Sequence, residues 1–138
     1  MTPRRRLVPP LAIAAVALAL AGCANAGGYT DLESTETRVL PDAVTEDALA
    51  NFDLDSMRWV GEHEGTDVWL GWGSSAGEVC ILFSADVDAW VTGCAGAGGQ
   101  MTLSGRGPQR FVVVPVGQPA PEGFAAISNN VYVASTEE

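Results

Sequence analysis

From residue 57 to the end of the chain, short apolar runs alternate with breaks rich in Gly, Ser, Asp, Asn and Pro. The runs contain many Val, Ile, Phe and Trp residues, which favour strands, and the breaks leave little room for helices. We count about eight candidate strands, enough for a packed β domain. They are residues 57–63, 67–72, 78–85, 89–94, 101–104, 110–116, 124–128 and 131–135. The sequence therefore predicts a mainly β fold: a small antiparallel meander, arranged as a sandwich or a partly closed barrel.

The chain before these runs has a different character. Residues 24–37 are small, polar and acidic, without an apolar period. We expect residues 23–50 to form a flexible acidic linker and residues 51–138 to form a single β-rich domain. Thr45 is a candidate N-cap for one short N-terminal helix over residues 46–52, because acidic residues directly after it would face the positive end of that helix.

The N-terminus has the layout of a secretory signal. Three arginines at positions 4–6 precede an apolar tract over residues 11–21 that ends in small residues. This tract is shorter than the roughly 20 residues that a membrane-spanning helix needs. We therefore expect residues 1–22 to be a signal peptide that is cleaved on export. Two alternatives stay open: an ordinary signal peptide, with the cysteine at position 23 there by chance, and an apolar anchor that is not cleaved.

The end of this tract, Leu20-Ala21-Gly22-Cys23, resembles the bacterial lipobox. In lipoproteins with this motif, the cysteine becomes the first residue of the mature chain and carries diacylglycerol on its sulfur. The resemblance implies that Cys23 is lipidated, with palmitate among the acyl chains. It also implies that this lipid holds the protein on the outer, extracytoplasmic face of the cell membrane.

The mature chain would be strongly acidic. Loss of residues 1–22 removes three of the seven basic residues and leaves four arginines against seventeen acidic residues, a formal charge of −13. Such a charge repels nucleic acids and anionic head groups, so we expect no nucleic-acid partner and a basic surface on any protein partner in the cell envelope. The chain has no lysine, which excludes a Walker A phosphate loop and Schiff-base chemistry.

The two remaining cysteines lie on either side of a predicted turn. If Val87 is the tip of a hairpin, Ala85 faces Ala89. The same count places Cys80 directly opposite Cys94. Facing residues of antiparallel strands have Cα atoms about 4.5–5.5 Å apart, which a disulfide accepts, and export would bring both thiols into an oxidising compartment. We therefore predict a disulfide between them.

Residues 73–77 fit the pattern G-x-S-x-G, with Ser75 in the position of a nucleophile. That motif joins a strand to a helix in a parallel sheet, and it needs an acid and then a histidine later in the chain. Here the following segment is a predicted strand, and the single histidine, His63, lies upstream. We interpret this segment as a hairpin turn.

Four neighbouring residues are the candidate metal ligands: Glu62, His63, Glu64 and Asp67. A zinc site usually has several nitrogen or sulfur ligands, and the spacing of a calcium-binding loop is absent. We expect the solvated end of a hairpin at this position, with no metal and no other cofactor.

The tryptophans are candidates for a binding surface: Trp59, Trp69, Trp72 and Trp90. Strand alternation places Trp72 on one face of its strand and Trp69 on the other, so at least one of this pair is expected to be partly exposed. Core packing is the alternative role, because a small domain needs large apolar side chains in its interior.

Residues 58–133 resemble a group of small uncharacterised secreted or lipid-anchored proteins from high-GC bacteria. The points of likeness are E-V-C-I-L at 78–82, W-V-T-G-C at 90–94, V-V-P at 113–115 and N-V-Y-V at 130–133. This resemblance implies a shared fold and export, and it carries over no catalytic residue.

These observations favour a lipid-anchored, non-catalytic binding or accessory module of the cell envelope. One histidine, no lysine and no paired-carboxylate motif leave few ways to assemble an acid, a base and a nucleophile. A small envelope hydrolase that uses His63 and a purely structural envelope protein stay as alternatives.

Overall fold

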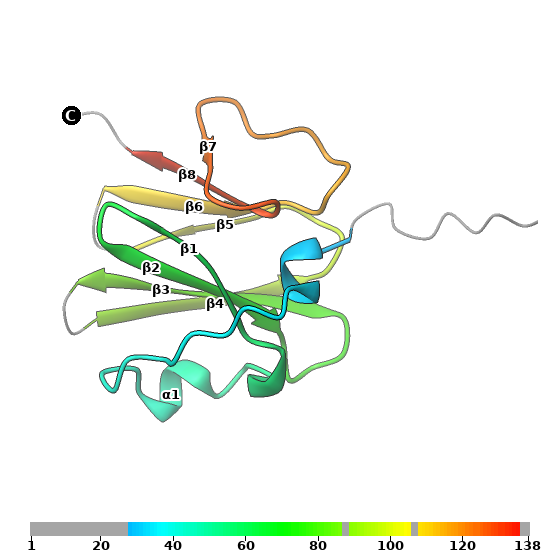
Figure 1. The fold of residues 1–138 in the computed structure, drawn as a ribbon. Coiled ribbons are helices and arrows are strands. Elements are labelled where there is room, and N and C mark those ends of the chain that lie inside the picture. Colours follow the sequence, from blue (N-terminus) through cyan, green and yellow to red (C-terminus); the bar gives the residue numbers. More distant parts are fainter. Residues whose placement is uncertain (1–27, 87–88, 106–107, 136–138) are drawn as a thin grey trace, which may run out of the picture.

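The chain folds into two antiparallel sheets of four strands each, which lie face to face (Figure 1). This structure is a computed structural model, and it describes residues 28–86, 89–105 and 108–135. The first sheet has the order β1-β2-β3-β4 and the second the order β5-β6-β8-β7. The strands are β1 (Arg58–His63), β2 (Thr66–Trp72), β3 (Glu78–Asp86), β4 (Ala89–Gly96), β5 (Met101–Ser104), β6 (Gln109–Val113), β7 (Ala125–Ala126) and β8 (Val131–Ser135). The prediction of a mainly β fold is confirmed, and its arrangement is a sandwich.

The main core lies between the two sheets. Because side chains alternate along a strand, every second residue of the central strands reaches this core. The rings of Phe83 in β3 and Phe111 in β6 meet there, with their centroids 4.4 Å apart. Other buried members from the strands are Val68, Leu70, Val79, Ile81, Met101, Val113, Val131 and Val133.

The opposite face of the first sheet is covered by the chain that precedes β1. Its apolar cluster has these buried members: Phe52, Met57, Trp69, Cys80 and Leu82. Helix α1 (Glu46–Leu49) packs against this cluster, and the 3-10 helix η2 (Leu54–Ser56) follows α1 along the chain. The first sheet is therefore buried on both faces, which explains why β3 contains an unbroken apolar run.

Helix α1 begins as predicted and ends earlier. The Thr45 side chain caps it by accepting a hydrogen bond of 3.3 Å from the backbone N–H of Ala48. The predicted helix extends to residue 52, whereas the observed helix ends at Leu49. The chain then turns so that Phe52 forms an isolated β-bridge with Gly73 and enters the cluster on the first sheet.

Described residues before β1 belong to the packed fold, so the linker prediction for residues 23–50 is wrong for residues 28–33 and for the chain around α1, where Leu40, Val44, Ala48 and Leu49 pack on the cluster over the first sheet. Gly28 pairs with Val116, and the 3-10 helix η1 (Thr30–Glu33) follows. Tyr29 and Leu32 are buried in the main core. Three residues per turn bring these two side chains to one side of the backbone, and a single turn is too short to show an apolar period in the sequence.

The predicted signal peptide, residues 1–22, and the predicted lipidation site, Cys23, lie outside the described residues. Within the part of the chain that the structure describes, no helix is both long enough and apolar enough to cross a membrane.

Candidate functional site

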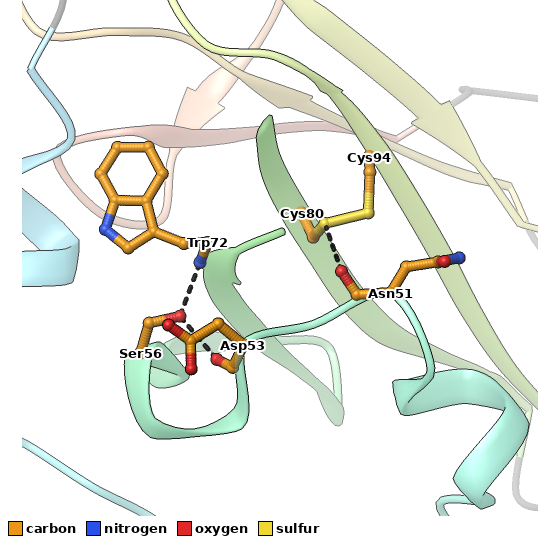
Figure 2. The surroundings of a disulfide bond; sticks show 6 residues. All are labelled: Asn51, Asp53, Ser56, Trp72, Cys80 and Cys94. Carbon is orange, nitrogen blue, oxygen red and sulfur yellow. Dashed lines mark hydrogen bonds between the residues drawn. A yellow bond between two sulfur atoms is a disulfide. The ribbon is translucent and has the colours of Figure 1, made fainter. Parts of the chain in front are cut away.

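Cys80 and Cys94 form a disulfide between β3 and β4, as predicted. The two residues are direct partners in the antiparallel register, and their Cα atoms lie 4.1 Å apart. Figure 2 shows the bond beside the segment that covers the first sheet, where the carbonyl oxygen of Asn51 lies 3.6 Å from Cys80 Sγ. Because Cys80 is fully buried under that segment, the disulfide is part of the packed interior.

The predicted register is wrong only next to the tip of this hairpin. From the pair Ser84 and Trp90 down to the two cysteines, the partners are those predicted. At the tip, Asp86 takes the place expected of Ala85 opposite Ala89, because the register shifts between Ser84 and Asp86. An irregularity of this kind adds one residue to one strand, and the alternation of apolar residues does not reveal it.

The structure divides the four candidate metal ligands into two pairs, Glu62 with Asp67 and His63 with Glu64. Glu62 and Asp67 are partners across β1 and β2, whereas alternation directs the neighbouring His63 to the other face of β1. Glu64 lies in the turn with a φ of 48°, and its Oε2 accepts a hydrogen bond of 3.2 Å from Gln109 Nε2. Among the described residues, no three or more His, Cys, Asp or Glu side chains form a group that could hold a metal.

Asp67 instead joins a structural contact at the edge of the first sheet. Its Oδ1 accepts hydrogen bonds from the Arg38 guanidinium at 2.6 Å and from Trp59 Nε1 at 2.8 Å. The guanidinium also lies over the Trp59 ring, 4.4 Å from its centroid. The three side chains satisfy one another and attach the segment before α1 to the sandwich.

His63 and Ser75 lie at opposite ends of β2. The Nε2 atom of His63 is buried, has no hydrogen-bond partner among the described residues, and lies 3.8 Å from Glu64 Oε2. Ser75 lies in the exposed turn that leads into β3, where an α/β hydrolase would have a helix. Six residue steps of β2 separate the two turns by about 20 Å. A base must be within hydrogen-bond reach of its nucleophile, so this geometry provides no Ser–His pair.

The tryptophans divide as strand alternation predicts. Trp69 is 1% exposed and meets Trp90 edge to face, with ring centroids 5.6 Å apart. Trp72 is 37% exposed and packs edge-on against Tyr29, also at 5.6 Å. Trp69 therefore has the role of a core residue, and Trp72 presents part of its indole at the surface.

A buried polar cluster joins the two ends of the described chain. Asp31 Oδ2 accepts hydrogen bonds from Ser128 Oγ at 2.6 Å and from the backbone N–H of Asn130 at 2.9 Å, and its Oδ1 accepts one from the backbone N–H of Asn129 at 3.2 Å. In return, Asn130 Oδ1 accepts a hydrogen bond from the Asp31 backbone N–H, and Asn130 Nδ2 donates to the carbonyl of Gly28. Sequence reasoning missed this cluster, because its members are about 100 residues apart and no local pattern connects them.

Four large apolar side chains are exposed within the described residues: Val39, Leu54, Trp72 and Val116. Two of them, Trp72 and Val116, lie at the same end of the sandwich. Tyr29 contacts the Trp72 ring, and Gly28, the residue before it, pairs with Val116. This end is where the described chain begins.

A comparison of the chain with known protein families, with curated proteins and with solved structures finds no match among any of them.

Proposed function

We propose that this protein is a lipid-anchored, extracytoplasmic module of the bacterial cell envelope that binds a partner and catalyses no reaction. The observation that carries the proposal is the sequence Leu20-Ala21-Gly22-Cys23 at the end of an apolar tract that follows three arginines. Lipidation of this cysteine would place the folded chain outside the cytoplasm, attached to the membrane by its first mature residue.

The disulfide supports export. Disulfides persist in oxidising compartments and are rare in the bacterial cytosol. With Cys80 and Cys94 paired, Cys23 is the one cysteine of the chain left for the lipid. The three cysteines of the chain therefore fit a lipoprotein, in which one thiol is alkylated by the lipid and the other two form a disulfide.

The arrangement of polar side chains supports binding over catalysis. Asp31 and Asp67 are occupied by hydrogen bonds within the fold, and the imidazole Nε2 of His63 is buried. Catalysis needs an acid, a base or a nucleophile that can reach its substrate. Exposed carboxylates are instead concentrated on the segment that covers the first sheet, at Asp42, Glu46, Asp47, Asp53 and Asp55.

That acidic segment suggests the chemistry of the partner. A surface rich in carboxylates attracts a basic surface and repels nucleic acids and anionic polymers. The module would therefore bind a basic protein of the cell envelope.

Replacing Cys23 with Ala tests the proposal. The wild-type protein should fractionate with membranes and enter the detergent phase on detergent partitioning. Any Cys23→Ala chain from which residues 1–22 have been removed should do neither. The double variant Cys80→Ala/Cys94→Ala is the matched control, because it removes two cysteines and keeps the lipobox. A Cys23→Ala chain that keeps residues 1–22 agrees with the proposal, because the change should block processing; a Cys23→Ala chain that is processed and enters the detergent phase as the wild-type protein does would refute lipid anchoring.

Crosslinking on intact cells tests the binding role. We expect the wild-type protein to capture a basic envelope protein, and His63→Ala to capture it equally well. Three results together would replace this proposal with the hydrolase alternative. No discrete partner is captured, cells that lack the protein no longer make an enzymatic product that wild-type cells make, and His63→Ala causes the same loss.

A further inference from the structure

One end of the sandwich is built from three loops and the beginning of the described chain. In Figure 1 the connections β2–β3, β4–β5 and β6–β7 gather at the end where η1 lies, and β8 finishes at the opposite end. We call residues 73–77, 97–100 and 115–121, together with Tyr29, the loop end. It is distinct from the turn β1–β2, which consists of Glu64 and Gly65 and follows His63.

Hydrogen bonds hold the loop end together. The backbone N–H of Ala97 donates to the Gly77 carbonyl at 2.7 Å, and that of Gly98 donates to Tyr29 Oη at 2.9 Å. Gln118 Nε2 donates to the Gly98 carbonyl at 2.8 Å. The three loops therefore form one connected surface, and Tyr29 places the start of the described chain at its centre.

The three loops are uncharged in a protein that is otherwise strongly acidic. Residues 73–77, 97–100 and 115–121 contain no Asp, Glu, Arg or His. Most of their residues are exposed, and beside them Trp72 is 37% and Val116, within the third loop, 40% exposed. Carboxylates border the loops: Glu78 and Glu122 directly follow the first and third loops, and the backbone N–H of Asp53 donates to the Trp72 carbonyl at 2.9 Å, which places η2 beside the first loop. Of the surfaces described above, the loop end is thus the one that anionic lipid head groups repel least.

The chain between Cys23 and Gly28 is short. It contains five Cα-to-Cα steps, which reach at most about 18 Å when fully extended. The hairpin turn at Glu64 and Gly65 lies a further length of β2 away from the loop end, about 20 Å. With Gly28 paired with Val116, a lipid on Cys23 therefore cannot reach the bilayer when the sandwich stands on that far turn with the loop end pointing away.

We propose that the loop end faces the lipid bilayer and lies against its head-group region, with the Trp72 indole and Val116 directed toward the membrane. This inference rests on the lipid anchor proposed above. Indole rings such as that of Trp72 favour the membrane interface, where one side of the ring is apolar and the other hydrated. The acidic residues around α1, Asp42, Glu46 and Asp47, then lie farther from the anionic lipids than η2 does, where a basic partner can bind them (Figure 1).

Single cysteine labels can test this orientation, because the lipidated, disulfide-bonded protein should have no free thiol. Ser75→Cys places a fluorophore on the loop end, and Glu62→Cys and Ser104→Cys place it at the far end of the first and second sheets. Each full-length lipidated protein is reconstituted into vesicles of phosphatidylethanolamine and phosphatidylglycerol that contain a nitroxide-head-group lipid. We expect several-fold stronger quenching at Ser75→Cys than at the two far positions.

The outcomes separate this inference from the proposed function. Protein that floats with the vesicles but shows equal quenching at the three positions, or stronger quenching at Glu62→Cys or Ser104→Cys, overturns the orientation and leaves the anchor intact. Protein that does not float, and whose mass shows no lipid, overturns the anchor and with it the orientation.

A longer chain between Cys23 and Gly28 tests whether this short tether causes the orientation. A Gly/Ser insertion of about 20 residues between Ala26 and Gly27 adds a reach of about 25 Å without touching the described fold. Flotation should be unchanged, and quenching at Ser75→Cys should fall to the level of the far positions. Quenching that survives the insertion would contradict the short tether as the reason for the orientation.

Discussion

Asp31 shows how one buried side chain can join two distant parts of a small β domain. Its carboxylate accepts three hydrogen bonds from the turn at residues 128–130, and it is only 8% exposed. Buried polar groups are costly unless they are paired, so such a cluster stabilises the fold only when each member has its partners. Here they bind the segment that follows the tether to the last turn of the described chain.

We predict that Asp31→Ala lowers the free energy of unfolding by about 3 kcal/mol, because hydrogen bonds to a charged group are lost and buried backbone N–H groups are left unpaired. The measurement is urea unfolding of a soluble chain that begins at residue 23 with Cys23→Ala. Glu33→Ala is the matched comparison, because Glu33 is an exposed acid in the same 3-10 helix, and its change should stay within about 0.5 kcal/mol. Equal effects of the two substitutions would show that the hydrogen bonds of Asp31 do not matter.

Single residues also show where sequence reasoning succeeded. The Cys80–Cys94 pair could be predicted because antiparallel register is a count outward from a turn, and the turn was marked by Asp86 and its neighbours. The shift beside Ala85 could not, because a bulge depends on local backbone geometry. Asp31 looked like an acidic linker residue, since nothing near it in the sequence indicates Asn130 as its partner.

At the scale of elements, the strands could be predicted from the sequence, whereas the segments that pack against the sheets could not. Each of the eight predicted runs overlaps an observed strand, although the run at 124–128 shortens to the two residues of β7. The alternation of apolar and polar residues and the turn-forming residues between strands are local signals, and the sequence contains both. Residues 28–33 and the segment over the first sheet contain one or two turns each, so their burial is decided by tertiary contacts.

The β3–β4 hairpin provides the prediction for an element. Removing its disulfide with Cys80→Ala/Cys94→Ala should lower the free energy of unfolding by about 3 kcal/mol, because the cross-link restricts the unfolded chain. Urea unfolding of the soluble chain with Cys23→Ala would measure the difference.

Thiol titration of the same soluble chain checks the bond itself. When unfolded without reductant it should show no reactive thiol, and after reduction it should show two. Two reactive thiols before reduction would contradict the disulfide.

At the scale of the whole molecule, charge is distributed unevenly. The acidic residues that give the chain its formal charge of −10 are absent from the three loops of the loop end and numerous on the segment over the first sheet. A molecule held by its N-terminus at the uncharged end would present its acidic side to the surrounding envelope. Charge placement, tether length and the position of Gly28 thus agree on one orientation.

This charge predicts the kinetics of partner binding. The association rate with a captured basic partner should fall several-fold as ionic strength rises, because salt screens long-range attraction, while dissociation should change much less. Stopped-flow or surface-binding kinetics over a salt series would measure both rates. An association rate that is independent of salt would remove the electrostatic argument for a basic partner.

The central claim is that Cys23 is the lipidated first residue of the mature protein. Intact-mass spectrometry of the wild-type protein extracted from membranes tests it most directly. We expect a chain of residues 23–138 that is heavier than its polypeptide by a diacylglycerol, with a further acyl chain where the amino group is also modified, and with no free thiol. A mass that still contains residues 1–22, or a mature chain with an unmodified Cys23 thiol, would contradict it.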